Sequence, residues 1–140
     1  MLRLIELTLN GDKEVQAIYP FESKDALEGD YEFKLGTAME NNTDELLIGL
    51  DNIGKVVFSA KVGSHAFAPR LFESKYTTEE EVDLKKYDTV DTLRAKFHKI
   101  KGSAIKNDAV KQEILRGFDE NGNSVEYCQW VRTVEPVIPE

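Results

Sequence analysis

Cysteine and histidine are scarce in this chain, which has one of the first and two of the second in 140 residues. The single thiol of Cys128 cannot form an internal disulfide, and one cysteine cannot supply a thiolate metal cluster. The histidines, His65 and His98, do not have the short helical spacing that presents two metal ligands on one face. Each is expected to be a solvated or hydrogen-bonded side chain, and no metal or cofactor is predicted.

Long apolar runs and an excess of positive charge are also missing. No run approaches the roughly 20 apolar residues that span a bilayer. The first residues form neither a basic leader nor an apolar signal core, so we expect a cytoplasmic protein without membrane contact. Eighteen Lys and Arg against 26 Asp and Glu give a net charge of −8, which disfavours a nucleic-acid partner.

Sequence motifs of catalysis are absent as well. The chain has no phosphate-binding glycine loop, dinucleotide fingerprint or Gly-x-Ser-x-Gly elbow. Ser64 and His65 are adjacent in sequence, but a nucleophile and its base need spatial proximity and an orienting group. Asp51 and Asp119 stand at hairpin entrances and are expected to accept turn amide hydrogens. We predict no catalytic residues; an enzyme would need a cluster of titratable side chains that the spacing does not show.

Apolar alternation and turn-forming clusters predict two strands, a helix and two strands in the first half. The turn Asn10-Gly11-Asp12 separates the first two strands, and the second is expected to stop at Pro20. Ser23 can cap the helix, which should end at Asn41 and Asn42. The predicted elements are strands over 2–9 and 15–19, a helix with the stripe Leu27, Tyr31, Leu35 and Ala38, and strands over 45–51 and 55–62.

The same order recurs in the second half, where Thr89 takes the place of Ser23 as a helix cap. The predicted elements are strands over 69–76 and 81–87, a helix with the stripe Leu93, Phe97, Ile100 and Ala104, and strands over 113–119 and 124–134. A shift of 66 residues aligns the helices and a shift of 68 aligns the strands that follow; the aligned pairs include Tyr31 with Phe97, Gly36 with Gly102, Glu45 with Glu113, Asp51 with Asp119 and Gly54 with Gly122. We interpret this as an internal duplication, although common turns and helical stripes can produce part of the match by coincidence.

The helix is where this alignment is weakest. Ile100 aligns with Lys34, and Lys101 aligns with Leu35. Either the buried faces of the two helices differ slightly, or the alignment slips there.

Four glycines within the predicted elements recur at aligned positions of the two halves. A glycine inside a helix costs about 1 kcal/mol relative to alanine, so Gly36 and Gly102 favour a close approach of the helix to a neighbour, with a left-handed helix end as the alternative. Gly49 and Gly117 lie in strands and favour a close approach or a bulge.

These patterns predict an α+β protein built by tandem duplication of a ββαββ unit, with antiparallel sheets that are each covered by one helix. The pseudo-repeats are 1–62 and 69–135, joined by a connector at 63–68 and followed by a proline-containing tail at 136–140. Half of this chain buries only a modest core by itself, so 1–140 is expected to be a single cooperative domain. Whether the two sheets are continuous is left open.

The two helices carry opposite charge. The first presents six acidic residues, and the second presents a basic set: Arg94, Lys96, His98, Lys99, Lys101 and Lys106. These are either solvated surfaces that attract each other weakly or, on the basic helix, a site for an anion or an acidic partner. The groove between the two units is the default place for a ligand. The candidate ligand-binding residues are Arg94, His98, Lys99 and Lys101.

Trp130 lies on the final predicted strand. Alternation sends Trp130 and Cys128 to one face and Tyr127 to the other. Core packing is the default for either face, and the alternative is that Trp130 is exposed and anchors a protein partner.

Together these features favour a non-enzymatic binding protein that occupies a protein partner or sequesters a small anionic ligand. Inhibitors and immunity or counter-defence factors act in this way, which is an analogy only. The alternative is a structural or assembly protein, such as a virion component, that forms homo-oligomers through its sheet edges and tail. Sequestration predicts a concave pocket lined by cations, whereas assembly predicts large symmetric contacts and no pocket.

Overall fold

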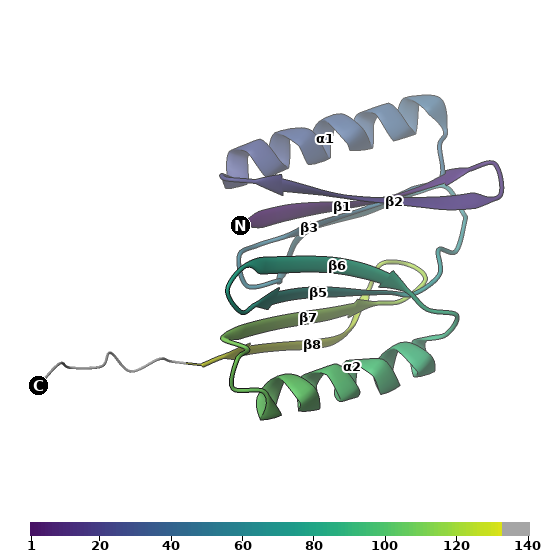
Figure 1. Ribbon diagram of the computed structural model, residues 1–140. Coiled ribbons are helices and arrows are strands. Elements are labelled where there is room, and N and C mark those ends of the chain that lie inside the picture. Colours follow the sequence, from purple (N-terminus) through teal and green to yellow (C-terminus); the bar gives the residue numbers. More distant parts are fainter. Residues whose placement is uncertain (133–140) are drawn as a thin grey trace, which may run out of the picture.

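Two ββαββ units follow one another along the chain and stack as four layers: helix, sheet, sheet and helix (Figure 1). The computed structural model describes residues 1–132. The first unit comprises β1 (Leu2–Asn10), β2 (Lys13–Phe21), α1 (Lys24–Asn41), β3 (Glu45–Leu50) and β4 (Val56–Val62), and the second comprises β5 (Arg70–Tyr76), β6 (Glu80–Lys86), α2 (Val90–Lys106), β7 (Gln112–Phe118) and β8 (Ser124–Val131). The predicted duplicated α+β fold is therefore confirmed. The end of the second pseudo-repeat, 133–135, and the tail at 136–140 lie outside the described residues.

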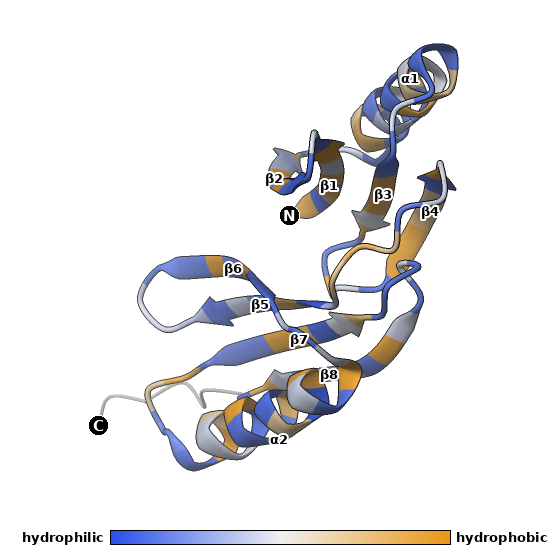
Figure 2. Cartoon of the chain, turned by 90° about the vertical axis from the view of Figure 1, so that its right-hand side faces the viewer, coloured by the Kyte–Doolittle hydropathy of each residue, from blue (hydrophilic) through white to orange (hydrophobic). Residues whose placement is uncertain are grey.

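The two sheets are separate and have the same topology. The strand orders are β2-β1-β3-β4 and β6-β5-β7-β8, with every pairing antiparallel. Most of β6 is hydrophilic, whereas β3 and β4 are largely hydrophobic (Figure 2). β6 is an edge strand with one buried side chain, Leu84, whereas every residue of the central strand β3 is buried. β4 is also an edge strand, but six of its seven residues are half-buried.

Both helices begin where their caps predict. The Ser23 hydroxyl accepts a hydrogen bond from the Ala26 amide, and the Thr89 hydroxyl accepts one from the Thr92 amide, each at 3.1 Å. Asn42 ends α1 in a left-handed conformation, with φ of 51°. The two helices therefore begin with equivalent caps, which is a further similarity between the two units.

The prediction that the second strand stops at Pro20 is wrong. β2 continues through Pro20 to Phe21, with Pro20 paired opposite Arg3. Because β2 lies at the edge of its sheet, a residue without an N–H group is tolerated there. The strand therefore need not stop at the proline.

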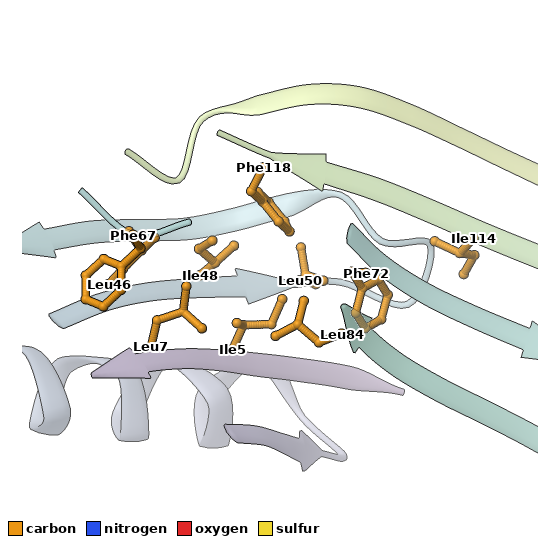
Figure 3. Packing of buried hydrophobic residues seen from close by; sticks show 10 residues of the cluster. All are labelled: Ile5, Leu7, Leu46, Ile48, Leu50, Phe67, Phe72, Leu84, Ile114 and Phe118. Carbon is orange, nitrogen blue, oxygen red and sulfur yellow. The ribbon is translucent and has the colours of Figure 1, made fainter. Parts of the chain in front are cut away.

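Ten buried hydrophobic side chains fill the space between the two sheets (Figure 3). The first unit supplies Ile5, Leu7, Leu46, Ile48 and Leu50, the connector supplies Phe67, and the second unit supplies Phe72, Leu84, Ile114 and Phe118. The inner face of each sheet is therefore covered by the other unit. A smaller cluster lies between each sheet and its own helix.

The hairpin turn of each unit packs against the other unit in a reciprocal way. A Cβ atom at Gly54 would lie 2.3 Å from Ile114 Cγ2 on β7, and one at Gly122 would lie 2.6 Å from Leu46 Cδ1 on β3. Gly54 is equivalent to Gly122, and Leu46 to Ile114, under the 68-residue shift. Both glycines have positive φ, 77° and 80°, so a side chain is excluded by conformation as well as by space. The units thus meet as the subunits of a two-fold dimer do.

Asp51 and Asp119 have the turn role that the sequence predicts. The Asp51 carboxylate accepts hydrogen bonds from the amides two and four residues later, at 3.0 and 2.9 Å. The Asp119 carboxylate accepts the equivalent pair, both at 2.9 Å. Asp51 and Asp119 therefore stabilise the turns that contain Gly54 and Gly122, the glycines that pack against the other unit.

The glycine predictions have two different outcomes. The expectation of close packing at Gly36 and Gly102 is wrong, because a Cβ atom at either position would have nothing within 4 Å. Neither glycine ends its helix. At Gly117 a Cβ atom would lie 2.6 Å from Leu93, and the register of the sheet shifts next to both Gly49 and Gly117. The strand glycines thus combine a close approach with a bulge.

Replacing Gly36 or Gly102 with alanine is expected to raise the free energy of unfolding by up to about 1 kcal/mol, because alanine is the better helix former and has free space there. Urea unfolding measures the change. Gly54→Ala is the matched control and should destabilise the protein. A loss of stability in Gly36→Ala would contradict the open environment at that helix position.

Candidate ligand-binding site

Each unit buries one glutamate on the side of its sheet that faces the helix. Glu45 on β3 is 7 % exposed and Glu113 on β7 is 1 % exposed. Each lies beside a second glutamate, Glu6 on β1 or Glu73 on β5. The pairs are equivalent, because Glu6 lies opposite Leu47 and Glu73 opposite Leu115 in the sheet registers.

Burial and the neighbouring carboxyl group both favour the protonated form of the two buried glutamates. Burial is the larger cause, followed by the hydrogen bond to Glu6 or Glu73, and together they raise the pKa of Glu45 and of Glu113 to about 8. Both are therefore mainly protonated at neutral pH. Glu113 holds its proton next to a carboxyl group that can accept it as a hydrogen bond.

The first unit covers its glutamate pair with its own side chains. Lys34 Nζ lies 2.8 Å from Asp30 Oδ2 and 4.6 Å from the centre of the Tyr19 ring. The Tyr19 hydroxyl donates a hydrogen bond to Glu6 at 3.2 Å. Burial lowers the pKa of Lys34, but the hydrogen bond to Asp30 and the charges of Asp30 and Glu6 together outweigh burial, and the net shift is upward. Lys34 is thus a protonated ammonium placed over the carboxyl groups.

The second unit has different side chains at these positions. The 66-residue shift places Ile100 at the position of Lys34, Lys96 at that of Asp30 and Lys85 at that of Tyr19. A cavity of about 250 Å³ lies there between α2 and the sheet, lined by Glu73 and Glu113 from the strands, among others. We call it the α2 cavity.

Lysines from the sheet and the helix also line this region. Lys75, Lys96 and Lys99 line the α2 cavity. A neighbouring cavity of about 250 Å³ shares Glu73, Lys96 and Ile100 with it and adds Asp83, Lys85 and Tyr87. Four lysines therefore face three carboxyl groups, of which Glu113 is protonated. The lining of the two cavities therefore carries a net positive charge, although the whole chain carries a charge of −8.

Two buried polar atoms in these cavities have no hydrogen-bond partner among residues 1–132: Glu113 Oε1 and the Tyr87 hydroxyl. An unsatisfied buried polar group costs about 1–3 kcal/mol, so such atoms are uncommon in folded proteins. Burial and the charges of Asp83 and Glu73 raise the pKa of Tyr87, which keeps its hydroxyl proton. One acceptor and one hydroxyl are thus available to a molecule that enters.

The four predicted ligand residues do not converge on one site. Lys99 lines the α2 cavity, whereas Arg94 contacts Glu126 on β8 at 3.3 Å. His98 is exposed and packs edge-on against its neighbour Phe97, with ring centres 5.2 Å apart. Lys101 lies near Cys128 and lowers the pKa of that thiol, although burial raises it more.

Lys75 and Lys96 also line the α2 cavity, although neither is among the four predicted ligand residues. Lys96, Lys99 and Ile100 are three and four residues apart and share one side of α2. Arg94 and Lys101 are seven residues apart and share the other flank. Sorting the basic residues by helical period would have separated these two groups.

Trp130 is half-buried, with the Arg132 guanidinium 4.8 Å from its ring centre. It lies opposite Glu113 in the sheet register. Its neighbours alternate as expected, because Tyr127 packs against the core between the sheets and Cys128 against the α2 cluster.

The prediction of a ligand groove between the two units is wrong. The ten-residue core fills that space, and the cavity at the boundary, lined by Arg3 and Glu80 among others, measures about 10 Å³. This is about the minimum that holds one water molecule. The sheets meet face to face, so the open space lies between a sheet and its helix instead.

A polar cluster also joins the units at one end of the interface. The Glu14 carboxylate accepts hydrogen bonds from Arg70 at 2.9 Å, from the Ala68 amide at 3.2 Å, and contacts His65 Nε2 at 3.0 Å. Burial raises the pKa of Glu14, but the hydrogen bonds from His65, Arg70 and Ala68 and the charge of Arg70 together outweigh burial, and the net shift is downward. His65 is thus a hydrogen-bonded structural side chain, as predicted.

Comparisons with known proteins give no match: no family model, no curated protein sequence and no solved structure is similar to this chain. Among residues 1–132, no group of three or more His, Cys, Asp or Glu side chains is arranged to hold a metal ion. Over the same range, no helix combines the length and the apolar character that crossing a membrane requires.

Proposed function

We propose that this protein binds a small anionic ligand in the α2 cavity and acts by holding that ligand rather than by transforming it. The observation that carries the proposal is the convergence of Lys75, Lys96 and Lys99 on a cavity of about 250 Å³. Concave sites with a few convergent polar groups are the usual places for small ligands.

The charge distribution supports an anion. Lys96 and Lys99 are exposed on α2, at the rim, whereas Glu113 is buried beneath them. An anion at the rim meets two mobile ammonium groups, and the largely acidic surface elsewhere leaves this region as a local positive site. A small anionic ligand in this cavity therefore favours sequestration over self-assembly as the function.

Replacing both Lys96 and Lys99 with glutamine should weaken anion binding at least tenfold, because each hydrogen bond from a charged group contributes about 1.5–3 kcal/mol. Isothermal titration calorimetry with ethyl phosphate and with glutarate, at low ionic strength, measures the affinity. Arg94→Gln with Lys101→Gln is the matched control, since it removes the same charge from the other flank of α2. The control should change the affinity less than threefold.

Equal losses in the two double variants would show that net charge, and not the cavity, attracts the anion. Failure of the unmodified protein to bind either probe would overturn the proposal. In that case native mass spectrometry showing a large homo-oligomer would favour the assembly alternative.

A further inference from the structure

We infer that the ligand of the α2 cavity is a zwitterion, with an ammonium group that sits over Glu73 and Glu113 and an anionic group that contacts Lys96. This inference rests on the proposed function and specifies its ligand class. The reason is the difference between the two units, which hold the same carboxyl pair under different side chains.

In the first unit the chain itself supplies both charges. The Lys34 ammonium acts electrostatically on both Glu6 and Glu45, and it pairs with Asp30 at 2.8 Å. An internal ion pair therefore covers the carboxyl groups, with its cation over them and its anion on the helix. The carboxyl groups of Glu6 and Glu45 therefore need no ligand to supply a cation.

In the second unit that ion pair is missing, but its carboxyl floor is kept. Ile100 stands where Lys34 supplies the cation, and Lys96 stands where Asp30 supplies the anion. Both line the α2 cavity with Glu73 and Glu113. A molecule with an ammonium and an anion close together would replace the Lys34–Asp30 pair, and its anion would meet the lysine that has taken the place of Asp30.

The unpartnered oxygen of Glu113 also favours an ammonium group over the carboxyl pair. Its Oε1 atom is a buried acceptor without a partner among the described residues, and an ammonium group carries three donors. A donor entering the cavity would satisfy this oxygen. A ligand with anionic groups alone would leave it unsatisfied and bring like charge toward Glu73.

Two matched ligand pairs test the inference: O-phosphoethanolamine against ethyl phosphate, and L-glutamate against glutarate. Within each pair, only the first member carries an ammonium group. The full-length protein should bind the amino member at least tenfold more tightly. Isothermal titration calorimetry measures the four affinities.

Two variants locate the effect. Glu113→Gln should abolish the advantage of the amino ligands. Ile100→Lys restores the lysine of the first unit, and it should remove the same advantage by supplying the ammonium from the chain. The second variant keeps Glu113, so it tests the idea even if Glu113→Gln does not fold.

The outcomes separate this inference from the proposed function. Equal affinity within each pair would overturn the zwitterion and leave an anion site. An advantage of the amino ligands that persists in both variants would also overturn it, because the ammonium would then bind elsewhere. If no member of either pair binds, both conclusions fail.

Discussion

Replacing Phe118 with alanine is expected to lower the free energy of unfolding by about 3–5 kcal/mol, the range for removing a fully buried aromatic side chain. Phe118 is 1 % exposed and lies in the core between the two sheets (Figure 3). Because both units contribute to this core, the loss should destabilise both. Denaturant unfolding gives the free energy, and native-state hydrogen exchange gives its distribution over β3 and β7.

The matched control is Phe33→Ala, which removes an aromatic ring that is 74 % exposed on α1. Its effect should stay within about 0.5 kcal/mol. If Phe118→Ala lowered exchange protection in β7 alone and left β3 unchanged, the two units would be independent domains. Equal loss in both strands is the expected sign of one cooperative unit.

Stability should fall as the pH rises from about 5 to 8. The folded state holds the protons of Glu45 and Glu113 up to a pKa of about 8, whereas the ordinary value is 4.5. Unfolding therefore releases protons between these values, and raising the pH favours the unfolded chain. At 1.36 kcal/mol per unit of pKa, the loss is on the order of a few kcal/mol for each glutamate.

Stability has the opposite slope at acid pH. Glu14 and Glu80 have lowered pKa values in the folded protein, because their hydrogen bonds and the charges of Arg70 and Arg3 together outweigh burial. Their contribution is present above about pH 4.5 and is lost as the pH falls through their folded values. Maximum stability is therefore expected near pH 5.

Chemical denaturation across pH 4–9 measures this profile. Replacing both Glu45 and Glu113 with glutamine should flatten the fall between pH 5 and 8, since glutamine is neutral at every pH. The control is Glu120→Gln at an exposed turn position, which should leave the slope unchanged. A protein whose stability rises from pH 5 to 8 would contradict the protonated state of the buried pair.

The sequence predicted the repeat and its local chemistry because these depend on neighbouring residues. Ser23 and Thr89 cap helices through amides three residues away, and Asp51 and Asp119 bond to amides within four residues. Local patterns of this kind can be read without knowing which surfaces meet. The strand end at Pro20 was predicted wrongly, because the position of a strand at the edge or the centre of a sheet is a property of the whole fold.

The site was harder to predict because it depends on contacts between distant strands and on a difference between the units. Glu113 meets Glu73 only through the pairing of β5 with β7. The alignment of Ile100 with Lys34 allows either a slip or a difference between the buried faces. The structure shows the second, because the buried residues of the two helices keep the 66-residue shift. The mismatch marks the place where the first unit holds an ammonium and the second has a cavity.

A two-dimensional ¹⁵N–¹H NMR titration of the full-length protein with O-phosphoethanolamine tests the central claim, ligand binding in the α2 cavity, most directly. Saturable shifts are expected for amides near Lys75 on β5, along 96–107 on α2 and near Glu113 on β7. The equivalent amides of the first unit, near Glu6, along 30–41 and near Glu45, should not move. Equal shifts in both units, shifts centred on the flank with Arg94 and Lys101, or no saturable shift would contradict the account.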